Sequence, residues 1–144
     1  MAIATSGTFT PIGRKLVNAS YVVATANDTG ASGNGPTIDN SDGLIDRIAF
    51  AVVCTNGTGT SPTVTATLKG SIDGTNWFNV LDSAGNAIAT GAVVAAATNS
   101  ELEDTNQEGI TKFPPKLRVS YAVGGSSTPG WTGSIQVDVQ RAAA

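Results

Sequence analysis

The side chains best suited to chemistry in this sequence are four carboxylates in one polar stretch, Glu101, Glu103, Asp104 and Glu108. Two carboxylates can work as an acid–base pair when their surroundings drive the two pKa values apart. The stretch that carries them, NSELEDTNQEG, predicts an exposed loop in which nothing provides burial. We therefore expect a solvated acidic loop in preference to a catalytic pair.

The sequence contains no histidine and one cysteine, Cys54. Without histidine the commonest general base is missing, together with the usual serine and cysteine triads and most zinc sites. Cys54 lies in an apolar run and has no second cysteine in the chain to bond with, which predicts a buried structural thiol. We expect no enzymatic activity and no cofactor.

Two loop motifs come close to ligand-binding patterns. IDNSDG, from Ile38 to Gly43, resembles half of a calcium loop, but Ile38 occupies the first ligand position and Ala49 the closing glutamate position. Weak calcium binding by the loop carboxylates stays open. The glycine-rich stretches lack the Lys-Ser/Thr ending of a phosphate loop, so they do not predict a nucleotide site.

The composition narrows the class of protein. Only 13% of the 144 residues are charged, about half the usual share of roughly 25%. Thr, Ser, Asn and Gly supply the polar surface, as is common in β-rich proteins. A net charge of −3 and scattered Lys and Arg argue against nucleic-acid binding. We see no secretory signal at the N-terminus and no apolar run of membrane-spanning length, which predicts synthesis in a cytoplasm and no membrane partner.

Three stretches, 63–72, 116–123 and 131–139, alternate apolar and polar residues with a period of two. This alternation indicates antiparallel strands with one buried face. The residues predicted to face the core are Val64, Ala66, Leu68 and Ile72 in the first stretch, Leu117, Val119, Tyr121 and Val123 in the second, and Trp131, Ile135, Val137 and Val139 in the third.

A more continuous apolar run at 44–55 predicts a central strand. Its core-facing residues are expected to be Ile48, Phe50, Val52 and Cys54. Stretches 15–26 and 86–98 predict further strands, while at 99–109 a single helical turn capped by Ser100 is possible. Turn-rich breaks are expected at 55–62 and 124–130, where Gly, Ser, Thr and Pro cluster.

These elements predict an all-β fold, a single-domain antiparallel β-sandwich or jelly roll of about seven or eight strands. The expected organisation is an N-terminal arm at 1–12, a sandwich domain at 13–141 and a short tail at 142–144. Within the domain, 27–43 is expected to be a long loop, and such loops tend to be functional or disordered. The arm and the loop are candidates for ordering on a partner.

The stretch GSIDGTNWF, Gly70 to Phe78, combines an Asp73-Gly74 turn signature with Trp77. Asp-Gly between apolar strands is a strong hairpin signal, because Gly accepts a positive φ and Asp bonds the turn backbone. We expect a turn in which Trp77 anchors the returning strand in the core. A sugar-stacking role for Trp77 is the alternative.

LKGSIDGTNWFNVLDS resembles the Ser-X-Asp-Gly-X-X-Trp hairpin of discoidin-like galactose-binding jelly rolls. Together with PPKLRVSYAV it also resembles small β-sandwich proteins of tailed-phage virions. The single-domain size, low charge, Thr/Gly/Ala richness and N-terminal arm are similar to those of head decoration, or cement, proteins. This resemblance implies binding to the capsid shell, often as trimers, with the major capsid protein as partner.

The sequence therefore favours a virion structural protein on the capsid surface, most simply a decoration protein that clamps neighbouring capsid subunits. Candidate capsid contacts in the arm and the loop are Phe9, Pro11, Ile12, Asn34 and Ile38. The main alternative is a carbohydrate-binding module that uses Trp77, Trp131 or Tyr121 as stacking platforms. A tail, neck or fibre component with the same sandwich is a third possibility.

Overall fold

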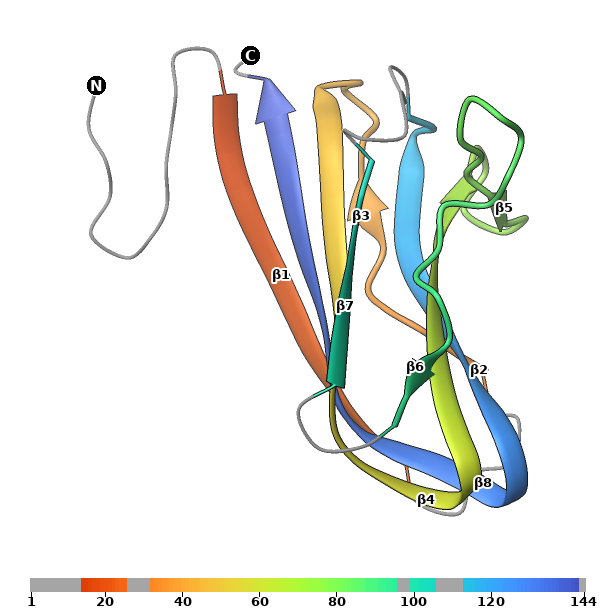
Figure 1. Cartoon of the computed structure of the whole chain (residues 1–144). Coiled ribbons are helices and arrows are strands. Elements are labelled where there is room, and N and C mark those ends of the chain that lie inside the picture. The colour runs from red at the N-terminus through yellow and green to blue at the C-terminus, as the bar shows by residue number, and fades with distance from the viewer. Residues whose placement is uncertain (1–13, 26–31, 96–98, 106–112, 143–144) are drawn as a thin grey trace, which may run out of the picture.

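The computed structural model describes residues 14–25, 32–95, 99–105 and 113–142, and every regular element in these ranges is a β-strand (Figure 1). No helix of membrane-spanning length and hydropathy occurs among them. The strands are β1 (Arg14–Thr25), β2 (Ser32–Asn34), β3 (Ile38–Asp39), β4 (Ile45–Ser71), β5 (Phe78–Asn79), β6 (Val93–Val94), β7 (Asn99–Asp104) and β8 (Lys116–Ala142).

Two strands of 27 residues each, β4 and β8, form the centre of the structure. They pair antiparallel from Ile45 opposite Arg141 to Ser71 opposite Lys116. Figure 1 shows both strands descending together, bending at the lower end of the view and rising again. Because the bend turns the paired strands back on themselves, each strand contributes one half to each of two layers.

The first layer runs in the order β1, second half of β8, first half of β4, β7. The second layer runs from β2 and β3 through the first half of β8 and the second half of β4 to β5 and β6. This order, with every pairing antiparallel, is that of a jelly roll. The predicted all-β sandwich or jelly roll is confirmed.

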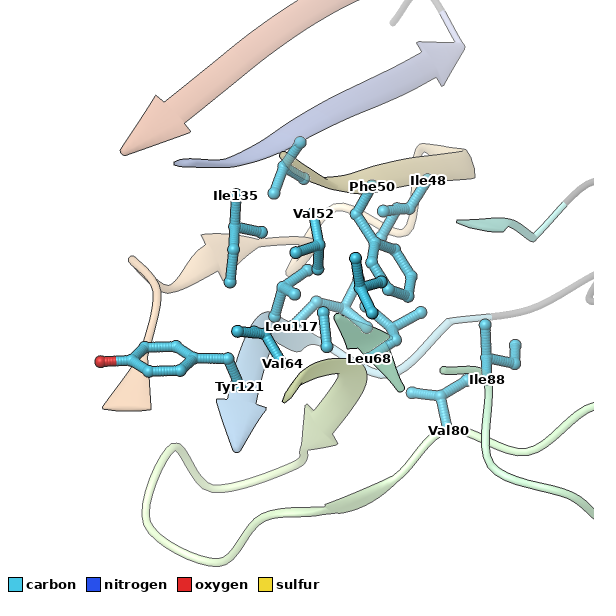
Figure 2. Packing of buried hydrophobic residues seen from close by; sticks show 14 of the residues in the cluster. Ile48, Phe50, Val52, Val64, Leu68, Val80, Ile88, Leu117, Tyr121 and Ile135 are labelled. Carbon is cyan, nitrogen blue, oxygen red and sulfur yellow. The ribbon is translucent and has the colours of Figure 1, made fainter. Parts of the chain in front are cut away.

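The core lies between the two layers, and the predicted alternation places its residues. Figure 2 shows Phe50 and Val52 of one layer facing Val64 and Leu68 of the other. Residues predicted to face the core and found buried are Ile48, Phe50, Val52, Cys54, Val64, Ala66, Leu68, Leu117, Val119, Tyr121, Val123, Trp131, Ile135, Val137 and Val139. Ile72 is the exception, at 74% exposure, because the alternation ends where Ser71 enters the turn.

The breaks between strands predicted at 55–62 and 124–130 are wrong, because neither segment ends a strand. Both segments belong to β4 and β8 and stay paired, with Thr58 opposite Gly130 and Thr60 opposite Ser126. Three shifts in register, between Cys54 and Asn56, Thr58 and Thr60, and Thr60 and Thr63, lie where the ladder bends. The residues that read as turn formers therefore make a corner in two continuous strands.

Two further predictions on the β4 side need correction. Residues 99–104 form strand β7, and the helical turn considered there is absent because their backbone pairs with residues 49–54 of β4. The strand predicted at 86–98 is reduced over 86–95 to β6 and isolated bridges, and 96–98 lie outside the described residues. Its pairing is interrupted at Thr90, whose side-chain oxygen accepts the backbone N–H of Ala66 at 3.0 Å.

The expected long loop at 27–43 is interrupted in its described part, 32–43, by two short strands. β2 and β3 have three and two residues and pair with β8, which joins this part of the loop to the second layer. Asn40 is buried beyond β3, where its side-chain amide donates to the carbonyls of Phe113 and Pro114 and its Oδ1 accepts the N–H of Ile45 at 2.9 Å. These bonds fix the segment to the sandwich.

The corner depends on backbone conformations that side chains oppose. Gly59 has a φ of 87°, and a Cβ added there would lie 2.8 Å from Cα of Pro129 and 2.8 Å from the carbonyl oxygen of Ser126. Gly125, on the facing strand, has a φ of 123°. Glycine therefore allows both the turn angle and the close approach of β4 to β8.

We predict that Gly59→Ala destabilises the fold more than Gly85→Ala. The two glycines have nearly the same φ, 87° and 88°, but a Cβ at Gly85 meets no atom within 4 Å. Both substitutions cost roughly 1–2 kcal/mol for the left-handed conformation, and Gly59→Ala adds about 1–3 kcal/mol of overpacking. Urea unfolding of both variants measures the difference, and equal destabilisation would show that the corner tolerates a side chain.

Candidate functional site

The turn predicted at Asp73-Gly74 joins β4 to β5. Gly74 has a φ of 78°, and its N–H donates to the buried Ser71 hydroxyl at 2.8 Å. One Asp73 oxygen accepts the N–H groups of Thr75 and Asn76 at 2.8 and 2.7 Å and the Ser71 hydroxyl at 3.1 Å. The other accepts the Asn76 side-chain amide at 2.6 Å. The hydrogen bonds that the carboxylate accepts therefore stabilise its own loop.

These bonds hold the pKa of Asp73 well below its ordinary value. The largest cause is the backbone N–H of Asn76, followed by that of Thr75. Hydrogen bonds to the charged form favour that form. The ionised carboxylate is therefore part of the folded turn, and this favours the structural interpretation of the stretch over a binding loop.

We predict that Asp73→Asn lowers stability at pH 7 and that the difference from wild type shrinks in acid. Because the folded-state pKa is depressed, the stabilisation is fully present above the unfolded-state value of about 3.9 and is lost as the pH falls below it. Thermal melts at pH 7 and pH 3 measure this. A difference that is the same at both pH values would exclude the charged carboxylate as its source.

Trp77 lies outside the core, contrary to the anchor that the sequence predicts. It is only partly buried, and the Arg118 guanidinium carbon lies 3.9 Å from its ring centroid. Such cation–π contacts are worth about 0.5–1 kcal/mol at exposed sites. The tryptophan in the core is Trp131, which is fully buried and meets Tyr121 edge to face at 5.7 Å.

This placement bears on the carbohydrate-binding alternative. Trp131 and Tyr121 are buried, so neither can stack on a sugar in the folded chain. Trp77 is the one of the three with an accessible ring, and Arg118 covers one side of it. Nothing in the sequence pointed to Arg118 as its partner, because the contact joins β8 to the residue before β5.

The candidate capsid-contact residues are spread over the chain. Phe9, Pro11 and Ile12 lie outside the described residues. Asn34 is exposed at the end of β2 and accepts the hydroxyl of Ser120 at 2.8 Å. Ile38 in β3 packs partly buried against the core. Of the two described residues, Asn34 is the more exposed.

The carboxylate group around β7 is divided among structural roles. Asp104 forms a bidentate ion pair with Arg47, whose Nε lies 2.9 Å from Oδ1. Glu101 accepts the N–H of Gly91 at 2.7 Å, which connects the two layers on this side. Glu108 lies outside the described residues. The hydrogen bonds from Arg47 to Asp104 raise the pKa of Arg47.

The IDNSDG segment is likewise folded by its own contacts. One oxygen of Asp39 accepts the N–H of Ser41 at 3.0 Å and also its hydroxyl, and this lowers the pKa of Asp39. Asp42 pairs with Arg141, which also donates to the carbonyl of Asp39 at 2.9 Å. In the described ranges, His, Cys, Asp and Glu nowhere come together in threes as metal ligands.

The sequence did not predict a broad surface on the outside of the first layer, which we call the neutral face. Ala51 is at its centre, in register with Leu102 of β7 on one side and Gln136 of β8 on the other. Leu102 is 65% exposed. The neutral face consists of Ala51, Val53, Leu102, Ser134 and Gln136, and it is continued by Ala49, which is buried. It carries no charge, and charged residues start at one end with Asp104 and Asp138.

Comparison with known proteins finds similarity in structure alone. No protein-family model matches the chain, and no curated protein matches it. A chain in the capsid of Ralstonia phage GP4 is similar over 94% of this chain and 91% of its own, with 16% sequence identity and a TM-score of 0.52. A chain of the cyanophage Pam1 capsid asymmetric unit covers 100% of this chain and 94% of its own, with 17% identity and a TM-score of 0.49.

At 16% identity, the likeness to the Ralstonia phage GP4 capsid chain shows a shared fold and no more. The match extends over nearly the whole of both chains, which agrees with a single domain. The second likeness is weaker and carries no argument.

Proposed function

We propose that the protein is a virion structural protein of a tailed phage, a head decoration protein that binds the outer capsid shell and clamps neighbouring subunits. The observation that carries the proposal is the jelly-roll match to a chain of a phage capsid over nearly its full length. The sequence resemblance to small virion sandwich proteins adds to it. The protein would be made in the host cytoplasm and act on the capsid surface, with the major capsid protein as partner.

The distribution of charge supports a role in an assembly. Desolvating long charged side chains is costly, and the core of a protein–protein interface is depleted of them. The neutral face carries no charged residue, and the nearest charges, Asp104 and Asp138, lie beyond one end of it. An uncharged face of this kind can be buried against a shell or against another copy at low cost.

Three carboxylates of the described residues form hydrogen bonds within the fold. Asp73, Asp104 and Glu101 bond to their own turn, to Arg47 and to Gly91. This supports a mechanical role in place of a catalytic one. The arm at 1–12 is proposed to reach across capsid subunits, where many weak contacts give high avidity.

Self-association belongs to the same proposal. The resemblance to decoration proteins favours a trimer, which would gather three arms over adjoining capsid subunits. The edge strand β1, which pairs only with β8 among the described elements, favours a two-fold contact between chains instead. The stoichiometry in solution separates the two assemblies.

We predict that replacing Phe9, Pro11 and Ile12 together by alanine abolishes capsid binding and leaves the fold intact. The arm precedes the sandwich, so its apolar contacts are expected to serve the shell. Co-sedimentation with capsids of the encoding phage assembled without this protein measures binding, and the melting temperature checks the fold. A loss of at least about tenfold in affinity is expected for a multivalent clamp.

The matched control replaces two exposed apolar residues of the sandwich, Ile72 and Leu81, by alanine. These substitutions remove exposed apolar side chains outside residues 1–12, and normal binding is expected. If the arm variant binds as well as wild type, the arm is not the clamp. If even the wild-type chain fails to bind the shell, the decoration role itself is wrong.

A further inference from the structure

Exposed sheet edges invite pairing with other chains, and proteins guard them with charges, short strands and interruptions. The β7 edge of the first layer is guarded in this way. It is six residues long and carries Glu101 and Glu103 in register with Val52 and Phe50, which face inward. Glu101 and Asn99 also bond to the backbone of residues 91 and 94.

The edges of the second layer are short and interrupted. On one side β2 and β3 have three and two residues, and Pro36 lies between them. On the other side β5 and β6 have two residues each and are separated by the turn at Asp82. None of these edges offers a long run of free backbone groups.

The β1 edge lacks these protections beyond its first two residues, Arg14 and Lys15. β1 is twelve residues long and pairs with β8 without a register shift, from Arg14 opposite Ala142 to Thr25 opposite Trp131. Among the described elements it pairs with β8 alone, so its other side is open. Residues 16–25 include no charged residue, proline or glycine. The backbone groups along this edge can therefore pair with a second strand.

We propose that the open edge of β1 pairs with β1 of a second copy of this chain, antiparallel and about a two-fold axis. The pairing would join the two first layers into one continuous sheet. It involves only this chain and holds whether or not the protein decorates a capsid.

The charge along β1 selects a second copy in antiparallel orientation. Its only charges, Arg14 and Lys15, lie at the start of the strand. In antiparallel self-pairing each cationic start lies beside the uncharged end of the other copy near Thr25, so the cations are at opposite ends of the ladder. A parallel pairing would bring like charges together, which is unfavourable.

Matching the faces of the two β1 strands limits the register of their pairing. Residues directly opposite one another in an antiparallel pair share a face. Val17, Ala19 and Tyr21 are in register with inward-facing residues of β8. A two-fold axis through any residue of β1 keeps the faces matched. The axis at Ser20, near the middle of the strand, gives a ladder over nearly the whole strand and places Val17 opposite Val23 and Ala19 opposite Tyr21. Ser20 of one copy would then lie opposite Ser20 of the other copy.

The test uses the full chain with a charge placed at the two-fold centre. Wild type is expected to sediment as a dimer, whereas Ser20→Lys and Ser20→Glu each sediment as monomers at the same concentration, because like charges would oppose one another. An equimolar mixture of the two variants should restore the dimer. Ser100→Lys, on the guarded β7 edge, is the matched control and should remain dimeric.

Several results would overturn the proposal: a wild-type chain that is monomeric at all concentrations, a trimer, or a dimer that Ser20→Lys leaves unchanged. Variants that separate but do not recombine would show that another segment, such as residues 1–13, covers the edge. If circular dichroism shows that a variant is unfolded, hydrogen exchange of the wild-type amides tests the pairing instead. Protection of residues 16–24 should rise with protein concentration, and constant protection would contradict the pairing.

Discussion

The structure depends on the pairing of β4 with β8 through a shared corner. Each strand is too long to serve one layer, and the pair folds over at residues 55–62 and 124–130, so that a single ladder builds both sheets. The fold is possible because Gly59 and Gly125 adopt positive φ there and let the strands approach closely. Once the corner is set, Phe50 and Val52 come to face Val64 and Leu68, and the remaining strands add to edges already defined.

The same corner determines which surfaces are left for partners. It gives the first layer two different edges, one closed by the Glu101–Gly91 contact and one left open at β1. It also exposes the neutral face, whose small side chains suit burial in an assembly. The few charged side chains of the described residues include pairs that stabilise the fold, Arg47–Asp104 and Arg141–Asp42.

The sequence predicted the parts of the fold that are governed by local patterns. Alternation in 63–68, 116–123 and 131–139 identified the inward residues because each strand buries one face. The Asp73-Gly74 turn followed from backbone chemistry alone. The corner was missed, because a Gly- and Ser-rich segment looks the same whether the chain reverses or two strands bend together. Likewise, Trp77 and Trp131 are distinguished only by long-range contacts, with Arg118 in one case and Tyr121 in the other.

The measurement that tests this account most directly is amide hydrogen exchange at the corner. If β4 and β8 remain paired through it, amides in 58–63 and 124–130 should exchange slowly, with protection comparable to that of the flanking strands. The turn at 83–85 provides the loop-like reference within the same molecule. Exchange at the corner as fast as in that turn would contradict the continuous ladder, and with it the single bent pair from which both layers are built.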